Sequence, residues 1–402
     1  MDTPTWPALI RALISGQALS AGQTSWAMNE IMDGAASPAQ IAGFGVALRA
    51  KGETAEEMSG LAAAMLAHAT PITVDGPVTD LVGTGGDGAH TVNVSTMATI
   101  VAAAAGAPIV KHGNRAASSA CGAADVLEAL GVVIDLPPNA TEVLFAEVGV
   151  AFLFAPLYHP AFRHTAGPRR ELGVPTAFNY LGPLTNPARP SSLAVGVADP
   201  RMGGVLAGVL AARGNSAIVF HGGGLDELTT TGPSAVWVVA DGAVTEAEFD
   251  PASLGVPRAS LADLRGADAA HNSAVVHSVL SGEPGPVRDI VLLNAAAALA
   301  AADGLSSVTS ASSATTASTV PAASATADAF AKALADGLSR ATDAVDSGAA
   351  QRLLARWSDT SHRLATPRPR LFRVRRRPAR WRRWPPGRAE SRCGTRCATG
   401  WR

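Results

Sequence analysis

The sequence has few of the features that mark secreted, disulfide-linked or membrane-spanning proteins. Its 402 residues contain only three cysteines, too few for a disulfide framework. The longest apolar run, residues 97–110, is too short to cross a bilayer and is interrupted by Gly106 and Pro108. The N-terminal segment carries Asp2 and amphipathic helices, where a signal peptide would have a continuous apolar block. We therefore expect a cytoplasmic protein with no membrane partner.

Apolar residues make up 47% of the chain, rich in Ala, Gly and Val, and the length allows a large core. Residues 4–70 predict four helices, one beginning at Pro38 behind Ser37 and another with a capping box of Thr54 and Glu57. From residue 80 the pattern becomes strand, glycine loop and helix, repeated. We predict a small all-helical domain at 1–72 and an α/β domain at 73–360, with a mainly parallel central sheet flanked by helices.

Two segments depart from this pattern. Residues 306–326 are low-complexity Ser, Ala and Thr, which predicts a disordered surface insertion. From residue 363 onward, fourteen arginines face the single acid Glu390, giving that segment a net charge of +13 and the rest −14. We predict that 361–402 is a disordered Arg-rich tail, with the composition of a frame-shifted GC-rich reading. Its tryptophans leave nucleic-acid binding as a less favoured alternative. Cys393 and Cys397 have no second pair with which to form a zinc site.

Most of the recognisable chemistry lies between residues 80 and 119. A short apolar strand runs into Gly83, Gly85 and Gly86, and the helix that follows offers Ser95 and Thr96 as cap hydroxyls. Backbone N–H groups in such a loop can approach an anion, and the helix dipole adds to the attraction.

A second strand, 107–110, ends in Lys111 and His112, at the edge where open α/β sheets bind ligands. We therefore predict two neighbouring phosphate loops. A simple tight turn is the alternative, since neither the dinucleotide fingerprint nor the P-loop spacing is present.

These loops and the motifs after them resemble the anthranilate phosphoribosyltransferases, which join anthranilate to phosphoribosyl pyrophosphate in tryptophan biosynthesis. The resemblance spans about residues 5–300 and 327–357. It implies a nucleoside phosphorylase/phosphoribosyltransferase-like fold, with residues 158–180 packing on the helical domain, and a homodimer formed through that domain. The segments that carry it are 111–131, 154–160, 169–173, 178–187 and 224–227.

The resemblance also implies the ligands of the site. Two Mg²⁺ ions accompany the pyrophosphate, and Ser95, Asp226 and Glu227 are implied to hold the metal. Without the resemblance, two adjacent acids would more often be an ordinary solvated pair on the surface. Their carboxylate oxygens nevertheless suit a hard cation. No covalent nucleophile is expected. The residues implied for phosphoribosyl pyrophosphate are Gly83, Gly86, Asp87, Thr91, Asn93, Val94, Ser95, Thr96, Lys111, His112, Gly113, Asn114, Arg115, Ala116, Ala117, Ser118, Ser119 and Ala123.

The acceptor is implied to be a small aromatic acid. Its carboxylate suits the fork-shaped guanidinium of Arg169, whereas the next residue, Arg170, is expected to form a surface ion pair. Pro156 and Tyr158 are expected to form an apolar wall, and His159 is as consistent with a structural role as with a functional one. The implied acceptor-binding set is Gly83, His112, Asn114, Tyr158 and Arg169.

The chain departs from the family pattern at several positions. Ala123 replaces a serine that contacts phosphate, and Gly223 lies where an acid often stands beside the metal pair. Ala116, Ala117 and Cys121 replace more polar residues of the second loop.

Two other functions remain open at this point. A pyrimidine-nucleoside phosphorylase has a similar fold but carries a different, serine- and lysine-rich second loop. A nucleic-acid-binding relative would need a basic groove in the body of the protein, and the body is acidic.

Overall fold

The computed structural model describes residues 3–116, 120–306, 308 and 322–365. Ala117, Ser118 and Ser119 of the second loop, residues 309–321 of the predicted insertion, and residues 366–402 of the predicted tail lie outside the described residues. None of the helices formed by the described part of the chain has the length and apolar character needed to cross a membrane.

Four helices are present in the N-terminal segment, as predicted: α1 (Trp6–Ile14), α2 (Ala21–Met32), α3 (Pro38–Lys51) and α4 (Ala55–Ala67). The Thr54 and Glu57 capping box opens α4, and Ser37 caps α3 with Pro38 in its first turn. The side chains that the helical period placed on one face, including Phe44 and Met58, are fully buried.

In the part of the chain that the structure describes, seven strands form one sheet in the order β3-β2-β1-β4-β5-β6-β7. Strands β1 to β5 are parallel, whereas β6 and β7 pair antiparallel at one edge, so the prediction of a mainly parallel sheet is confirmed. Their bounds are β1 Thr79–Gly83, β2 Ile109–Gly113, β3 Val150–Phe154, β4 Ser192–Gly196, β5 Ser216–His221, β6 Ser234–Ala240 and β7 Ala243–Phe249.

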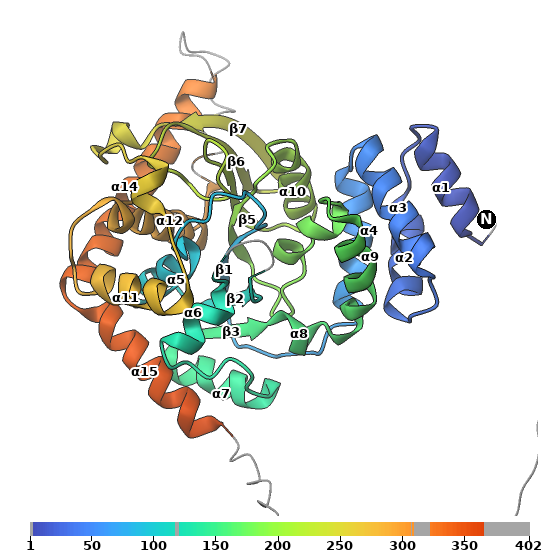
Figure 1. Cartoon of the computed structure of the whole chain (residues 1–402). Helices are drawn as coiled ribbons and strands as arrows, with labels where there is room; N and C mark the ends of the chain where they lie inside the picture. Colours follow the sequence, from blue (N-terminus) through green and yellow to red (C-terminus); the bar gives the residue numbers. More distant parts are fainter. Residues whose placement is uncertain (1–2, 117–119, 307, 309–321, 366–402) are drawn as a thin grey trace, which may run out of the picture. The chain divides into compact units, whose positions relative to one another are not determined.

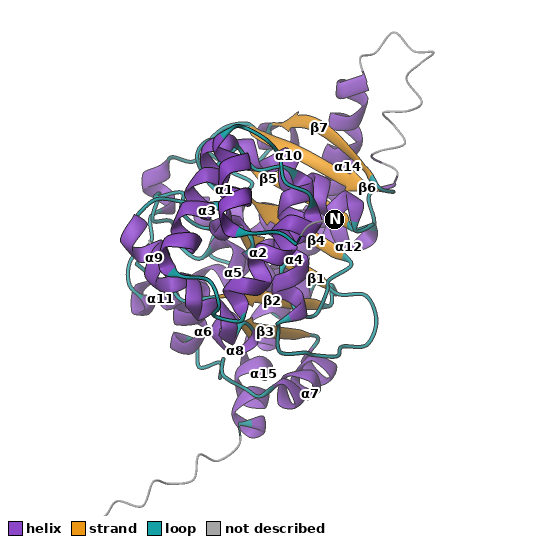
Figure 2. Ribbon diagram, turned by 90° about the vertical axis from the view of Figure 1, so that its right-hand side faces the viewer, coloured by secondary structure: helices purple, strands orange, loops and turns teal. Residues whose placement is uncertain are grey.

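Helices cover both faces of the sheet, because alternate strand residues point to opposite sides. Leu81 of β1 belongs to one core cluster and Val82, the next residue, to the other. Figures 1 and 2 show the strands between the two groups of helices. The remaining elements are α5 Val94–Ala104, α6 Ala123–Ala129, α7 Pro138–Val148, α8 Ala155–Tyr158, η1 Pro160–Thr165, α9 Ala166–Leu172, η2 Ala177–Tyr180, η3 Gly182–Leu184, α10 Arg201–Ala212, η4 Pro251–Leu254, η5 Leu261–Leu264, α11 Ala269–Leu280, α12 Pro286–Asp303, α14 Ala322–Asp346 and α15 Ala349–Leu364.

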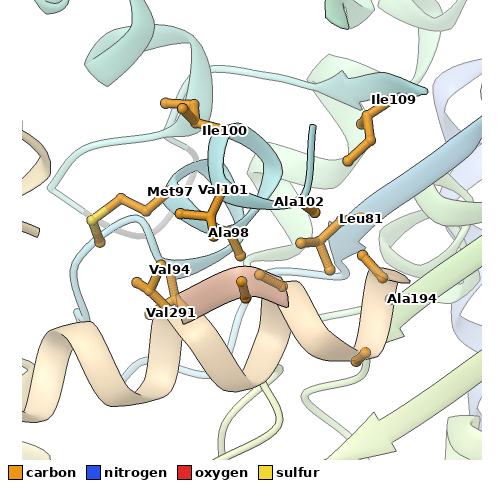
Figure 3. Close-up of a cluster of buried hydrophobic side chains, with 14 of the residues drawn as sticks. Leu81, Val94, Met97, Ala98, Ile100, Val101, Ala102, Ile109, Ala194 and Val291 are labelled. Carbon is orange, nitrogen blue, oxygen red and sulfur yellow. The ribbon is translucent and has the colours of Figure 1, made fainter. Parts of the chain in front are cut away.

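The first face carries α5, α12, α14 and α15. In Figure 3, Met97 and Ala98 of α5 lie in one apolar cluster with Val291 of α12 and Leu81 of β1. The second face carries α10, and α1–α4 share its apolar cluster. Within the segment 158–180, η1 contacts α2 and α9 contacts α3.

Two boundaries differ from the sequence prediction. Helix α14 begins at Ala322, inside the predicted insertion, and α15 continues to Leu364, past the predicted start of the tail at 361. The α15 extension is held by tertiary contacts: the buried Ser361 hydroxyl accepts a hydrogen bond from the Val133 N–H at 2.9 Å and donates to the Ser358 carbonyl at 2.7 Å. The last turn of α15 is therefore part of the folded body.

Candidate functional site

The site lies where the chain reverses direction across the sheet. The strand order runs outward from β1 through β2 and β3, and then resumes on the other side of β1 at β4. The carboxyl ends of β1 and β4 therefore form the crevice in which open α/β sheets bind ligands. Gly83 and Gly196 end these two strands and are paired across them.

Asp226 fills the space above both glycines. A Cβ atom at Gly83 would lie 2.2 Å from Asp226 Oδ2, and one at Gly196 would lie 1.7 Å from the Asp226 carbonyl oxygen. Asp226 Oδ2 also accepts a hydrogen bond of 2.6 Å from the Gly85 N–H. Only glycine at 83 and 196 allows the carboxylate to lie at this strand edge.

The glycine-rich loop after β1 is fixed at its base and open above. The Thr84 hydroxyl accepts a hydrogen bond from the Ala198 N–H at 3.0 Å, which ties the loop to the segment after β4. Gly85 and Gly86 have φ of +68° and +86°, a region that favours glycine, and no atom lies within 4 Å of the place where their Cβ atoms would be. The loop is therefore ordered at its base, and its glycine surface is free to approach a ligand.

Three carboxylates gather beside this loop. Burial, together with the nearby Asp87 carboxylate, raises the pKa of Asp226 to about 7. Burial and the negative charge of Asp226 also raise the pKa of Glu227 well above its usual range, while Lys111 opposes the shift. The raised pKa values show that the site by itself disfavours two ionised carboxylates, a state that a bound divalent cation would stabilise. Hard divalent cations are bound by oxygen ligands of this kind.

A magnesium ion fits this donor set if the substrate completes its shell. Among residues 3–116, 120–306, 308 and 322–365, no group of three or more His, Cys, Asp or Glu side chains could hold a metal ion by itself. Magnesium is commonly bound through one or two carboxylates plus substrate phosphates, so two carboxylates and the half-buried Ser95 hydroxyl are sufficient on the protein side.

Lys111 lies beneath the loops and has little contact with solvent. Its side chain is 2% exposed, and its ammonium donates to the Leu81 carbonyl and, at 3.3 Å, to Ser95 Oγ. Burial lowers the pKa of Lys111, and the negative charges of Asp80, Glu227 and Asp226 partly offset that effect. The ammonium therefore contributes positive charge from below the site.

Asp80 and Asn186 form a buried polar link that sequence reasoning missed. Burial raises the pKa of Asp80 to about 6. Its carboxylate accepts hydrogen bonds from the His112 N–H at 3.2 Å and from Asn186 Nδ2 at 2.9 Å, which joins β1 to β2 and to the 182–187 segment. The sequence could have indicated a role for Asp80, because it is a single acid within an apolar strand. No local sequence pattern indicated that Asn186 would contact it.

The start of α5 differs from the prediction. The helix begins at Val94 with Asn93 at the N-cap position and no side-chain cap, so Ser95 and Thr96 are not cap hydroxyls. The Val94 N–H instead bonds to the Val92 carbonyl at 2.7 Å. The Thr96 hydroxyl is buried and has no hydrogen-bond partner within the described residues.

Asn93 and Thr91 make contacts within the protein. Asn93 Nδ2 donates to the Cys121 carbonyl at 3.0 Å, and its Oδ1 accepts from Asn272 Nδ2 at 2.8 Å. Thr91 pairs through its backbone with Arg265. The Asn93 amide thus connects α5 to the second loop, with α11 supporting it.

The second loop leaves β2 at Gly113 and reaches α6 at Ala123. Asn114 is exposed, and its Oδ1 accepts the Arg115 N–H at 2.7 Å. The Arg115 guanidinium pairs with Asp125 at 2.9 Å and Glu128 at 2.5 Å. Asp125 also accepts the N–H groups of Ala116 and Gly122, at 3.0 and 2.9 Å, and so anchors the loop at both ends.

His112 lies between this loop and the 182–187 segment. Its Nδ1 contacts the Gly182 carbonyl at 3.2 Å, an acceptor, which assigns the proton to Nδ1. Burial lowers the pKa of His112 to about 3, so the ring is neutral at physiological pH. Its Nε2 is buried and has no partner in the part of the chain that the structure describes. The neighbouring His159, 5.1 Å away between ring centroids, bonds to the Thr185 carbonyl at 2.8 Å, which gives it a structural contact.

Arg169 is the half-buried cation of α9. Its guanidinium lies 5.4 Å from the centre of the Phe162 ring, and burial lowers its pKa. Neither Arg169 nor Arg170 forms an ion pair with a described residue, so the surface ion pair expected for Arg170 is not found. Arg169 therefore carries a desolvated charge that an anionic ligand would balance.

The prediction that Tyr158 forms a wall for the acceptor is wrong. Its side chain is 1% exposed and packs in the core with Phe145, Val110 and Leu153. The ring lies in an apolar cluster with residues of β2 and β3, so it forms no exposed wall. Pro156, the other wall residue, is exposed.

Residues 7–69 match the helical bundle domain of a glycosyl transferase family, and residues 75–351 match the α/β domain of a glycosyl transferase family. An anthranilate phosphoribosyltransferase of Thermobifida fusca (strain YX) is 56% identical over 362 residues, covering 90% of this chain and 98% of that relative.

Two solved structures show the same fold. The anthranilate phosphoribosyltransferase of Thermus thermophilus has a TM-score of 0.78 at 37% identity, covering 88% of this chain and 99% of that one. The Saccharomyces cerevisiae anthranilate phosphoribosyltransferase, solved in complex with PRPP and Mg, has a TM-score of 0.76 at 26% identity, covering 89% and 98%.

These relatives favour neither a pyrimidine-nucleoside phosphorylase nor a nucleic-acid-binding protein. The helical bundle and the sheet flanked by helices agree with the expected fold class. The chain therefore belongs to the family of anthranilate phosphoribosyltransferases.

Proposed function

We propose that this protein transfers the phosphoribosyl group of 5-phosphoribosyl 1-pyrophosphate to the amine of anthranilate, in tryptophan biosynthesis. The observation that carries the proposal is the open glycine loop beside the Asp226 and Glu227 carboxylates at the point where the strand order reverses. That arrangement suits a polyanion that arrives with a divalent cation. We further propose a cytoplasmic homodimer formed through the helical domain.

The phosphate groups would lie against the glycine loop. The open surface at Gly85 and Gly86 lets the backbone approach a phosphate closely, and the start of α5 adds the positive end of the helix dipole. The second loop, 111–119 with Ala123, would hold the remaining phosphate and the ribose. Because Arg115 pairs with Asp125 and Glu128, its part in phosphate binding would require exchange of these partners.

Ser95, Asp226 and Glu227 would hold Mg²⁺, and we propose two ions in all. When bound, the metal supplies positive charge that stabilises the leaving pyrophosphate. The carboxylates supply the oxygen ligands, and Lys111 holds Ser95 Oγ from below at 3.3 Å.

The acceptor would be oriented from both ends. Arg169 has no carboxylate partner among the described residues, and its planar guanidinium can bind the anthranilate carboxylate through two parallel hydrogen bonds. His112 donates from Nδ1 to Gly182, so its Nε2 can only accept, and an aromatic amine can donate to it. Asn114 lies exposed on the adjoining loop and would contact the same amine.

The reaction then needs positioning more than covalent catalysis. The amine nitrogen attacks C1 of the ribose, the C1–O bond to pyrophosphate breaks, and the amine loses one proton. Positive charge develops on the ribose ring as the pyrophosphate leaves, so holding both reactants in line supplies much of the rate enhancement. No side chain has to form a covalent intermediate.

The test is the loss of anthranilate fluorescence. We expect turnover only when phosphoribosyl pyrophosphate and Mg²⁺ are both present. Phosphorolysis of thymidine or uridine by the purified protein, with no consumption of anthranilate, would refute the proposed function.

A further inference from the structure

A single polar side chain interrupts the buried part of α12. Residues 290–301 are all buried, and Asn294 is the only one of them that is not apolar. Its side chain is 0% exposed. Burying an amide without hydrogen bonds costs free energy, so its position requires partners that satisfy it.

Those partners belong to the segment that carries the metal-binding carboxylates. Asn294 Oδ1 accepts from the Leu228 N–H at 3.0 Å, and Nδ2 donates to the Leu228 carbonyl at 2.9 Å. Nδ2 also donates to the Ile290 carbonyl, one turn earlier in α12, at 2.8 Å. Oδ1 faces an N–H group and Nδ2 faces two carbonyl groups. Exchanging the two amide atoms by a half-turn about the Cβ–Cγ bond would therefore break all three hydrogen bonds.

Leu228 directly follows Glu227 and belongs to no strand. The Asn294 amide therefore satisfies both backbone groups of Leu228, as a neighbouring strand would do in a sheet. On the other side of the carboxylate pair, Leu225 and Gly222 exchange two backbone hydrogen bonds of 3.0 and 3.1 Å. Asp226 and Glu227 thus lie between two residues whose backbones are fixed.

We propose that Asn294 is a positioning residue of the cation site, which sets the direction of the Glu227 and Asp226 carboxylates by holding the Leu228 backbone. The inference rests on the proposed function, since it takes these carboxylates as ligands of the divalent ion. Asn294 contacts neither substrate nor metal and acts only through the chain. Its loss should weaken cation binding more than it affects the acceptor.

The experiment measures binding of Mn²⁺, in the presence of phosphoribosyl pyrophosphate, by electron paramagnetic resonance of the free ion. Asn294→Leu keeps the size and removes every hydrogen bond. Asn294→Ser suits the alanine-rich helix but cannot span to Leu228, so it supplies a variant that folds if the leucine variant does not. Phe330→Leu, in the same core cluster but on α14, is the control for general loosening of the core.

We expect both Asn294 variants to weaken Mn²⁺ binding by about 10- to 100-fold, as is typical when a partner that orients a metal ligand is removed. The KM for anthranilate, measured at saturating metal and phosphoribosyl pyrophosphate, should change less than about twofold because uniform acceptor binding is untouched. Phe330→Leu should lower the melting temperature and leave Mn²⁺ binding unchanged.

Unchanged Mn²⁺ affinity in the folded Asn294 variants, or an equal loss in Phe330→Leu, would overturn the positioning role alone. Failure of the proposed metal site gives a different result. In that case Asp226→Asn with Glu227→Gln would bind Mn²⁺ as well as the unaltered protein, and both proposals would fall together.

Discussion

Replacing Arg169 with glutamine should separate acceptor binding from stability. The guanidinium is half-buried over Phe162 and has no carboxylate partner among the described residues. Burial lowers the pKa of Arg169, which means that the fold disfavours its charged form. The charge therefore costs stability until an anion binds.

The size of the effect on binding follows from the contact that is lost. Removing a hydrogen bond to a charged group costs about 1.5–3 kcal/mol. That corresponds to a rise of about 10- to 150-fold in the KM for anthranilate, with a much smaller change in the KM for phosphoribosyl pyrophosphate. The melting temperature should stay the same or rise, because a desolvated and unpaired charge is removed.

The assay is steady-state fluorescence with anthranilate varied at saturating phosphoribosyl pyrophosphate and Mg²⁺, together with thermal unfolding. Arg170→Gln is the matched control, since Arg170 is the next residue and is exposed. An unchanged KM for anthranilate in Arg169→Gln, or the same rise in Arg170→Gln, would show that another group holds the acceptor carboxylate.

Three further outcomes are expected. Asp226→Asn with Glu227→Gln should abolish turnover yet raise the melting temperature, because burial and mutual repulsion disfavour the charged pair; activity at ordinary Mg²⁺ concentrations would contradict this. The pKa of His112 is lowered to about 3, so its contribution to stability is present above about pH 6.5 and is lost as the pH falls toward 3. In urea unfolding, the free energy of unfolding of His112→Asn should therefore change less with pH than that of the unaltered protein, by up to about 1.4 kcal/mol per pH unit. An equal pH dependence of the two proteins would refute this explanation. A chain ending at Ala365 should retain full turnover, whereas ending at Trp357 should destabilise it by removing the Ser361 contact; loss of activity on removing 366–402 would show that those residues have a function.

The two loops could be predicted because their residues are close in sequence. Glycines after an apolar strand, and a lysine and histidine at the end of the next one, indicate ligand-binding turns, and parallel strands bring such turns to one edge. The four N-terminal helices were equally accessible, since capping boxes and helical spacing are local signals.

The contacts that complete the site were not accessible in that way. Gly85 meets Asp226 across 141 residues, and Asn294 meets Leu228 across 66. A local sequence pattern cannot predict which distant side chains will be in contact, because tertiary packing determines those contacts. Tyr158 illustrates the same limit: its sequence neighbours suit a core residue or a substrate wall, and the neighbours in space, Phe145 and Val110, select the core.

The end of α15 escaped prediction for a related reason. Thr360 and Ser361 are weak helix formers close to an arginine-rich segment, so no local signal extends the helix to Leu364. Their burial against the body of the protein, with Ser361 bonded to Val133, keeps the helix going for another turn.

The apolar cluster shared by α1–α4 and α10 limits how this protein can be recombined. A Cβ at Gly208 of α10 would lie 3.0 Å from the Ala55 Cβ of α4, so these two helices approach closely at this pair of small residues. A chimera that takes residues 1–72 from a relative and keeps α10 from this chain would bring together two surfaces that were not selected to fit. Exchange of the helical bundle should therefore include α10, even though well over a hundred residues separate α10 from the bundle in the sequence. The packing of α10 on the helical bundle, and not their distance in the sequence, therefore determines which elements must be exchanged together.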